Sequence, residues 1–166
     1  FTAEHLRRLV ISVLRLGDMF CQKLAAGELA HSRIKAVSAE ESLHKLIVPV
    51  DLNARNIMFR REKKADGTIA HTDAVIVDLG EVRRLPAIAL VNELMKQYIV
   101  RVPDGADVVC SAIVEYMGPL RAAYFFGAVA AKLNSVHLSH EIQQVILKYA
   151  KETGRTFVMQ EIVNLL

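Results

Sequence analysis

The dipeptide Asp66-Gly67 lies between two apolar runs of β type. A dipeptide of this kind between such runs is a strong sign of a tight β-hairpin turn. The sequence therefore predicts a hairpin with arms at residues 57–64 and 68–78. Because a hairpin returns the chain to its starting point, we expect Asn56 and Asp78, at the open end of the two arms, to lie side by side.

The segment before the hairpin has the apolar period of an α-helix. Thr2 is a favourable N-cap, and apolar residues recur at helical spacing from Leu6 to Leu24, until Gly27. This pattern predicts one long helix in the segment 1–27.

A connection and a helical tail complete the chain. The connection 28–45 contains a capping-box pair, Ser38 and Glu41, which predicts a short helix. After Pro86 the expected helices are 87–100, 106–132 with a break at Gly118-Pro119, 139–152 and 157–165. The chain is thus expected to be a single domain of the α+β class, mainly helical, in which helices surround a small β hairpin. Its expected parts are a long helix at 1–27, a connection at 28–45, a hairpin region at 46–86 and a helical tail at 87–166.

Apolar residues are abundant for a chain of 166 residues: 52% are hydrophobic and 23% are charged. The excess predicts an apolar surface that a second copy in a homo-oligomer, or another partner, covers. The longest apolar stretch, 122–131, is about half the length that a bilayer requires, so no transmembrane segment is expected. Cys21 and Cys110 lie in apolar helical patterns, which indicates free thiols in a reducing compartment and predicts a cytoplasmic protein.

The net charge of +3 is modest for a nucleic-acid-binding protein. The local basic clusters fit either solvated surfaces or a weak contact with an anionic partner, so nucleic acid is not the favoured partner. The cationic residues concerned are Arg60, Arg61, Lys63, Lys64, Arg83 and Arg84.

Several large side chains in the second half of the chain recur at helical spacing. This spacing is more typical of a hydrophobic core than of a ligand cage. The residues assigned to the core in this way are Met95, Tyr98, Tyr116, Tyr124, Phe125 and Phe126.

Three polar residues, Asp51, Asn56 and Asp78, border the β-type runs. Phosphoryl transfer requires a carboxylate that orients the attacking hydroxyl and accepts its proton, and hard oxygen ligands for Mg²⁺. Asp51 suits the first role, and Asn56 and Asp78 suit the second. An aspartate that ends a strand before a turn often only caps or turns the backbone, and this second interpretation fits the sequence as well.

At these residues the sequence resembles the carboxyl-terminal lobe of the protein-kinase-like fold. The catalytic-loop pattern D-L-x-x-x-N is present from Asp51 to Asn56, and the metal-binding D-F-G pattern appears as Asp78-Leu79-Gly80. The stretches DLNARNIMF and VIVDLGEVRRLP are similar to those of compact bacterial proteins, the Kdo (lipopolysaccharide-core) kinases and the YrbL-type proteins.

The resemblance implies an ATP-dependent kinase in which Asp51 and Asn56 are catalytic. It implies further that Asn56 and Asp78 bind Mg²⁺ and that Asp78, Asn56 and Arg55 contact ATP. The implied acceptor is a hydroxyl of a sugar, of a lipid-linked molecule or of another small molecule.

Other functions remain open. The glycine-rich loop and the strand lysine of the family's amino-terminal lobe do not occur in this sequence. By this resemblance the chain is expected to be either a kinase-like phosphotransferase or its incomplete carboxyl-terminal lobe. Two alternatives are a non-catalytic, mainly helical interaction module and a weak nucleic-acid binder.

Overall fold

A computed structural model describes residues 1–28, 45–49, 51–77 and 82–166 of the chain. Within these ranges the fold is α+β and mainly helical, as predicted. The elements are α1 (Ala3–Ala25), β1 (Lys45–Pro49), η1 (Ala54–Asn56), β2 (Ile57–Lys63), β3 (Ile69–Ile76), β4 (Val82–Pro86), α3 (Ala87–Tyr98), η2 (Ile99–Arg101), α4 (Gly105–Met117), α5 (Pro119–Ala131), η3 (Leu133–Ser135) and α6 (His140–Leu165). The short helix predicted at Ser38 and Glu41, and the candidate site residue Asp78, lie outside the described residues.

The long first helix is confirmed. The Thr2 side chain accepts a hydrogen bond from the His5 backbone N–H, and His5 Nδ1 accepts one from the Thr2 backbone N–H. This reciprocal cap satisfies backbone donors that a helix start leaves without partners. One face of α1 is buried against α4, β1 and β3; its buried residues are Leu6, Leu9, Val10, Val13, Leu14 and Gly17.

The predicted hairpin is confirmed as the antiparallel pair β2 and β3, joined by the turn at Asp66-Gly67. Gly67 has a φ of +85°, which glycine adopts at little steric cost. The Asp66 carboxylate accepts hydrogen bonds from the backbone and the hydroxyl of Thr68, and thereby closes the turn.

A second antiparallel pair joins β1 to β4, which the sequence did not predict. Val48 pairs with Arg83 and Ile47 with Arg84, so the two strands come from opposite sides of the hairpin. The pairing brings the start of the loop at Asp51 and the return of the chain at Val82 to the same end of a two-stranded sheet.

The predicted break at Gly118-Pro119 is confirmed, because α4 ends at Met117 and α5 begins at Pro119. The prediction of two helices at 139–152 and 157–165 is wrong: α6 is continuous from His140 to Leu165. An interior glycine such as Gly154 costs a helix only about 1 kcal/mol relative to alanine. At the same point Thr153 is buried and its hydroxyl donates to the Tyr149 carbonyl, 2.7 Å away, within the same helix.

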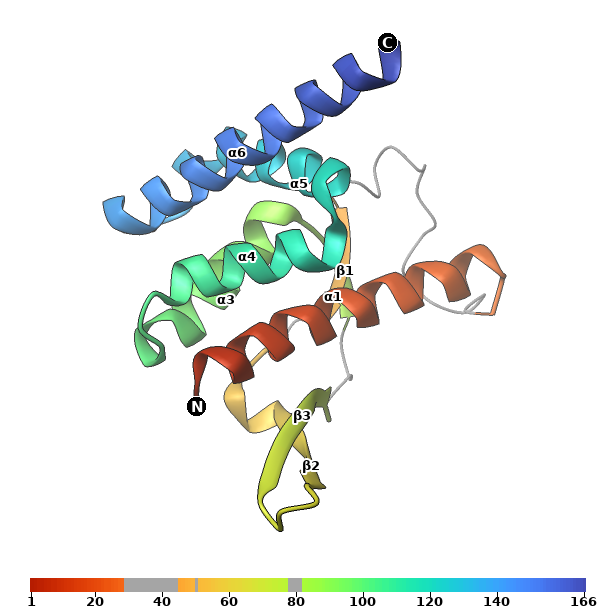
Figure 1. Cartoon of the computed structure of the whole chain (residues 1–166), viewed down its shortest axis with the longest axis vertical. Helices are drawn as coiled ribbons and strands as arrows, with labels where there is room; N and C mark the ends of the chain where they lie inside the picture. The colour runs from red at the N-terminus through yellow and green to blue at the C-terminus, as the bar shows by residue number, and fades with distance from the viewer. Residues whose placement is uncertain (29–44, 50, 78–81) are drawn as a thin grey trace.

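The hairpin and α6 lie at opposite ends of the molecule, and α1, α3 and α4 lie between them (Figure 1). The first half of α6 packs on α5 and α4, whereas its last turns extend beyond the body and carry exposed apolar side chains (Figure 1). Most of the hydrophobic core lies among α1, α3, α4 and α5, beneath the loop that leads from β1 to β2.

Candidate active site

The segment between β1 and β2 is a tight loop that its own polar side chains hold together. Asp51 Oδ1 accepts a hydrogen bond from the Asn53 backbone N–H, at 3.1 Å. Asn53 Oδ1 in turn accepts from the Arg55 backbone N–H, also at 3.1 Å, and caps the short helix η1. These are two consecutive Asx-type turns, so Asp51 does have the turn-forming role that the sequence allowed.

That turn leaves half of the Asp51 carboxylate available. The side chain is exposed, and within the described residues Oδ2 accepts no hydrogen bond. Oδ1 is thus the orienting atom, while Oδ2 remains able to accept a proton or a hydrogen bond. The turn-forming role and a chemical role for Asp51 are therefore compatible.

Asn56 turns back across the same loop. Its Nδ2 donates to the Asp51 backbone carbonyl at 3.4 Å, near the long limit of a hydrogen bond. Within the described residues Oδ1 of the same amide accepts no hydrogen bond. A neutral hard oxygen of this kind is a suitable ligand for Mg²⁺.

The open end of the hairpin closes onto Asn56. The Val77 backbone N–H donates to the Asn56 carbonyl at 2.9 Å, which extends the β2–β3 ladder by one residue. The prediction that the two ends of the hairpin lie side by side is confirmed as far as Val77. Asp78 follows Val77 in the sequence and lies outside the described residues, as do Leu79 and Gly80.

The hairpin has an apolar outer face beside Asn56. Met58 lies opposite Val75, and their side chains point to the same side of the strand pair. Met58 is 60% exposed and Val77 is 54% exposed. Ile57 and Phe59, one residue to either side of Met58, pack instead on the core. This outer face, formed by Met58, Val75 and Val77, is called the apolar shelf below. It begins where the polar loop ends.

A buried tyrosine at the end of α3 forms a hydrogen bond with the backbone of the loop. Tyr98, the last residue of α3, donates its hydroxyl to the Leu52 backbone carbonyl, and both residues are 1% exposed. Burial raises the pKa of the Tyr98 phenol to about 12, and the charges of Arg101 and Asp51 act on it in opposite directions. The hydroxyl therefore remains a hydrogen-bond donor at neutral pH.

The cationic candidates have different surroundings. Arg55 donates its backbone N–H to Asn53 within the loop, while its side chain is exposed and makes no ion pair with a described residue. On β4, Arg83 is exposed and Arg84 is half-buried, and both have interaction partners. The cluster on the hairpin is exposed; it consists of Arg60, Arg61, Lys63 and Lys64.

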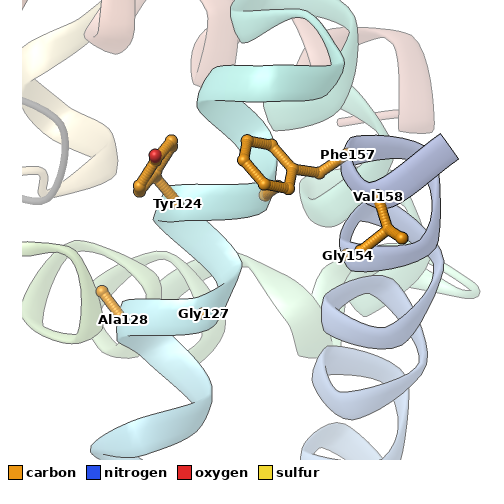
Figure 2. Close-up of a pocket in the computed structure, with 7 residues that line it drawn as sticks. Tyr124, Gly127, Ala128, Gly154, Phe157 and Val158 are labelled. Carbon is orange, nitrogen blue, oxygen red and sulfur yellow. The ribbon is translucent and has the colours of Figure 1, made fainter. Parts of the chain in front are cut away.

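An apolar groove of about 520 Å³ lies between α5 and α6, away from the loop at Asp51. Figure 2 shows Tyr124 of α5 and Phe157 of α6 on its two walls, with Gly127 and Gly154 where no side chain fills the space. The rings of Tyr124 and Phe157 meet edge to face, with centroids 5.7 Å apart. None of the described residues that line the groove is charged.

The groove changes the assignment of one predicted core residue. Met95, Tyr98, Phe125 and Phe126 are fully buried, as expected. Tyr124 is 50% exposed and lines the groove, so its assignment to the core was wrong. The apolar walls make this surface the best match in the described chain for the apolar surface that the composition predicted.

Within the described residues no group of three or more histidine, cysteine, aspartate or glutamate side chains is placed to hold a metal ion. None of the described helices combines the length and the apolar character that a membrane crossing requires. No protein-family model, no curated protein and no solved structure matches this chain.

Sequence reasoning did not find the roles of Tyr98, Met58, Val75 and Val77 around the loop. The outer face of the hairpin could have been read from the period of two in Asn56-Ile57-Met58-Phe59, where every second residue points away from the core. No local pattern indicated the bond from Tyr98 to Leu52, because 46 residues separate the two positions.

Proposed function

We propose that the chain is the carboxyl-terminal lobe of a kinase-like phosphotransferase, with its reaction centre at the loop of Asp51 and Asn56. The observation that carries the proposal is that some polar side-chain atoms of this loop hold the backbone turn, whereas others make no hydrogen bond to a described residue. Asp51 Oδ1 and Asn56 Nδ2 hold the loop, and this leaves Asp51 Oδ2 and Asn56 Oδ1 for chemistry. Two oxygens from different side chains of one loop, each without a hydrogen bond to a described residue, support a role beyond turning the chain.

The donor set fits a magnesium–nucleotide complex. Asn56 Oδ1 supplies a neutral oxygen, and Asp78, two positions after the Ile76 that pairs with Ile57, would supply the charged one. Bound Mg²⁺ would neutralise charge on the phosphates of ATP. Arg55, whose guanidinium is exposed beside the loop, would add a cation toward the same phosphates.

Asp51 would orient the acceptor. A hydroxyl that donates to Oδ2 is held in one direction, because the bond from the Asn53 N–H keeps the carboxylate from rotating. As the hydroxyl oxygen attacks the γ-phosphorus of ATP, the bond from that phosphorus to the bridging oxygen would break, ADP would leave, and Oδ2 would accept the hydroxyl proton. Most of the rate would arise from this positioning, since phosphoryl transfer asks for little covalent chemistry from the protein.

The apolar shelf of Met58, Val75 and Val77 supports a nucleotide at the same place. The Val77 N–H is bonded to the Asn56 carbonyl, so a flat base could lie on the shelf while its phosphates reach the polar loop. We propose a sugar, a lipid-linked molecule or another small molecule as the acceptor, by resemblance to the bacterial kinase-like proteins. We place the activity in the cytoplasm, which the free thiols of Cys21 and Cys110 support.

The direct test is nucleotide binding. Melting temperatures of the wild type are measured with Mg²⁺ alone, ATP alone and both together. Ligand at about 100 times its dissociation constant should stabilise the fold by roughly 2.7 kcal/mol, a shift of a few degrees. Asn56→Ala and Asp78→Ala should abolish the shift that requires both ligands, while Asn134→Ala, an exposed asparagine in η3, should retain it. A wild type whose melting temperature does not rise with Mg²⁺ and ATP together would contradict the proposal.

The groove favours a second candidate function, association between two copies of this chain. The described residues that line the groove are uncharged, and α6 has one charged residue, Glu161, after Arg155. Every copy offers both features. A twofold arrangement in which each α6 end lies in the other copy's groove would bury both at once. Sedimentation equilibrium of the wild type tests this candidate.

A further inference from the structure

The peptide unit between Leu52 and Asn53 is bonded at both of its polar ends. Its carbonyl oxygen accepts from the Tyr98 hydroxyl, and its N–H donates to Asp51 Oδ1 at 3.1 Å. A peptide is planar, so its two ends rotate together. Whatever fixes the carbonyl of Leu52 therefore also fixes the donor that orients the Asp51 carboxylate.

Tyr98 is itself held by three parts of the fold. Its ring stacks on that of Phe1, with centroids 5.6 Å apart and an interplanar angle of 25°. Its backbone is the last residue of α3 and continues into η2. The η2 residue Ile99 is packed against α4, where a Cβ on Gly105 would lie 3.0 Å from the Ile99 Cα. The hydroxyl thus projects from a rigid point of the helical body.

We infer that Tyr98 is a positioning residue for Asp51, acting through the peptide that joins Leu52 to Asn53. The inference rests on the proposed function, because it assigns Tyr98 a task in phosphoryl transfer. The bond is buried, so water does not compete for the Leu52 carbonyl. Its loss leaves that carbonyl without a donor and frees the peptide to turn.

Tyr98→Phe removes the hydroxyl and keeps the ring, so the stacking on Phe1 and the core packing persist. In phosphate transfer from Mg²⁺–ATP to water or to an acceptor, we expect kcat to fall about tenfold to a hundredfold, as for other small misplacements of a reacting group. The KM for ATP should not change, since Tyr98 does not touch the proposed nucleotide site.

Tyr149→Phe is the matched control. Its hydroxyl is 3.4 Å from the Asp107 carbonyl, between α6 and α4, far along the chain from the loop. Both variants lose one hydroxyl from a half-buried or buried tyrosine, so both should lower the melting temperature slightly. Only Tyr98→Phe should lower kcat. Equal kcat values for Tyr98→Phe and wild type would overturn the inference.

Amide hydrogen exchange gives a second readout that needs no activity. The Asn53 N–H should exchange faster in Tyr98→Phe than in the wild type, relative to the N–H of Thr68 in the distant hairpin turn. If the wild type binds no Mg²⁺–ATP, the proposed function fails, and the exchange of Asn53 still decides whether Tyr98 fixes this peptide. Unchanged exchange at Asn53 would overturn the inference even in an active protein.

Discussion

Gly17 of α1 packs directly on the main chain of Ile47 in β1: a Cβ at residue 17 would lie well under 3.0 Å from the Ile47 carbonyl oxygen. The backbone of a paired strand cannot move aside as a flexible side chain can. The approach brings α1 against the strand that leads into the loop at Asp51.

Gly17→Ala should therefore destabilise the protein, although alanine is the better helix former. We expect a loss of about 1–3 kcal/mol in the free energy of unfolding, as for other overpacked sites. Gly127→Ala on α5 is the control, since a Cβ there meets no described atom within 4 Å. Because Gly127 lines the groove, both variants are compared at concentrations at which the protein is a monomer. The control should gain up to about 1 kcal/mol from helix propensity. Urea denaturation measures both, and equal effects of the two changes would contradict the described contact.

The ion pair of Asp18 and Arg121 should make stability depend on pH. Arg121 donates to both Asp18 oxygens at 2.8 Å, and the Tyr116 hydroxyl adds a bond at 2.7 Å. Burial alone would raise the pKa of Asp18, but the bonds from Arg121 and Tyr116 outweigh it, so this pKa lies below its usual value. The stabilisation is thus complete above the unfolded-state pKa of about 3.9 and is lost as the pH falls through the lower folded-state pKa.

Arg121→Met keeps most of the side-chain length and removes the charge. At pH 7 we expect it to cost about 1.5–3 kcal/mol, the range for hydrogen bonds to charged groups. Urea denaturation of wild type and variant across the acid range should show their difference in stability shrinking below a pH of about 4. A difference that stays constant down to the acid transition would show that the pair contributes no charge-dependent stability.

Asp51→Asn should separate chemistry from nucleotide binding. Asparagine retains an oxygen that can accept from the Asn53 N–H, so the loop keeps its turn, while the proton acceptor is lost. We expect kcat to fall by roughly 10²–10⁴, the usual contribution of a general base. The thermal shift with Mg²⁺–ATP should persist. A variant with unchanged kcat would exclude Asp51 as the proton acceptor.

Val158→Asp tests the groove as an interface between two copies. Val158 lines the groove and is 54% exposed, so a carboxylate there should not disturb the monomer but should oppose burial of the groove. Sedimentation equilibrium should show a concentration-dependent dimer for the wild type and a monomer for the variant. Val100→Asp changes another exposed valine, 85% accessible in η2, and should leave the dimer intact. A wild type that stays monomeric at high concentration would rule out this interface.

The local part of the fold was readable from the sequence because local forces decide it. The cap at Thr2, the turn at Asp66-Gly67 and the break at Gly118-Pro119 each depend on a few adjacent residues, and each is confirmed. The single helix α6 was missed because the cost of Gly154 is small beside the gain from packing its first half on α5.

The tertiary contacts of the fold could not be predicted from the sequence. The pairing of β1 with β4 joins strands on either side of the hairpin, and VRRLP has no strong β pattern of its own. At the candidate site, Asp51 and Asn56 were found from a six-residue pattern, and their mutual hydrogen bond lies within that span. Tyr98 was found only as a core residue, since the contact of its hydroxyl with Leu52 depends on how α3 docks beneath the loop.

The docking of α1 also has a consequence for how the protein is made. Two ion pairs that join α1 to later helices, Arg7 with Glu115 and Asp18 with Arg121, each span more than a hundred residues, at separations of 108 and 103. On the ribosome, α1 emerges long before α4 and α5 exist, at a synthesis rate of about 5–20 residues per second. For several seconds, the apolar face of α1 therefore lacks the later helices that it contacts in the folded protein. The nascent chain is therefore a candidate client for chaperones until α5 has been translated, and its folding should proceed in one late, cooperative step rather than helix by helix.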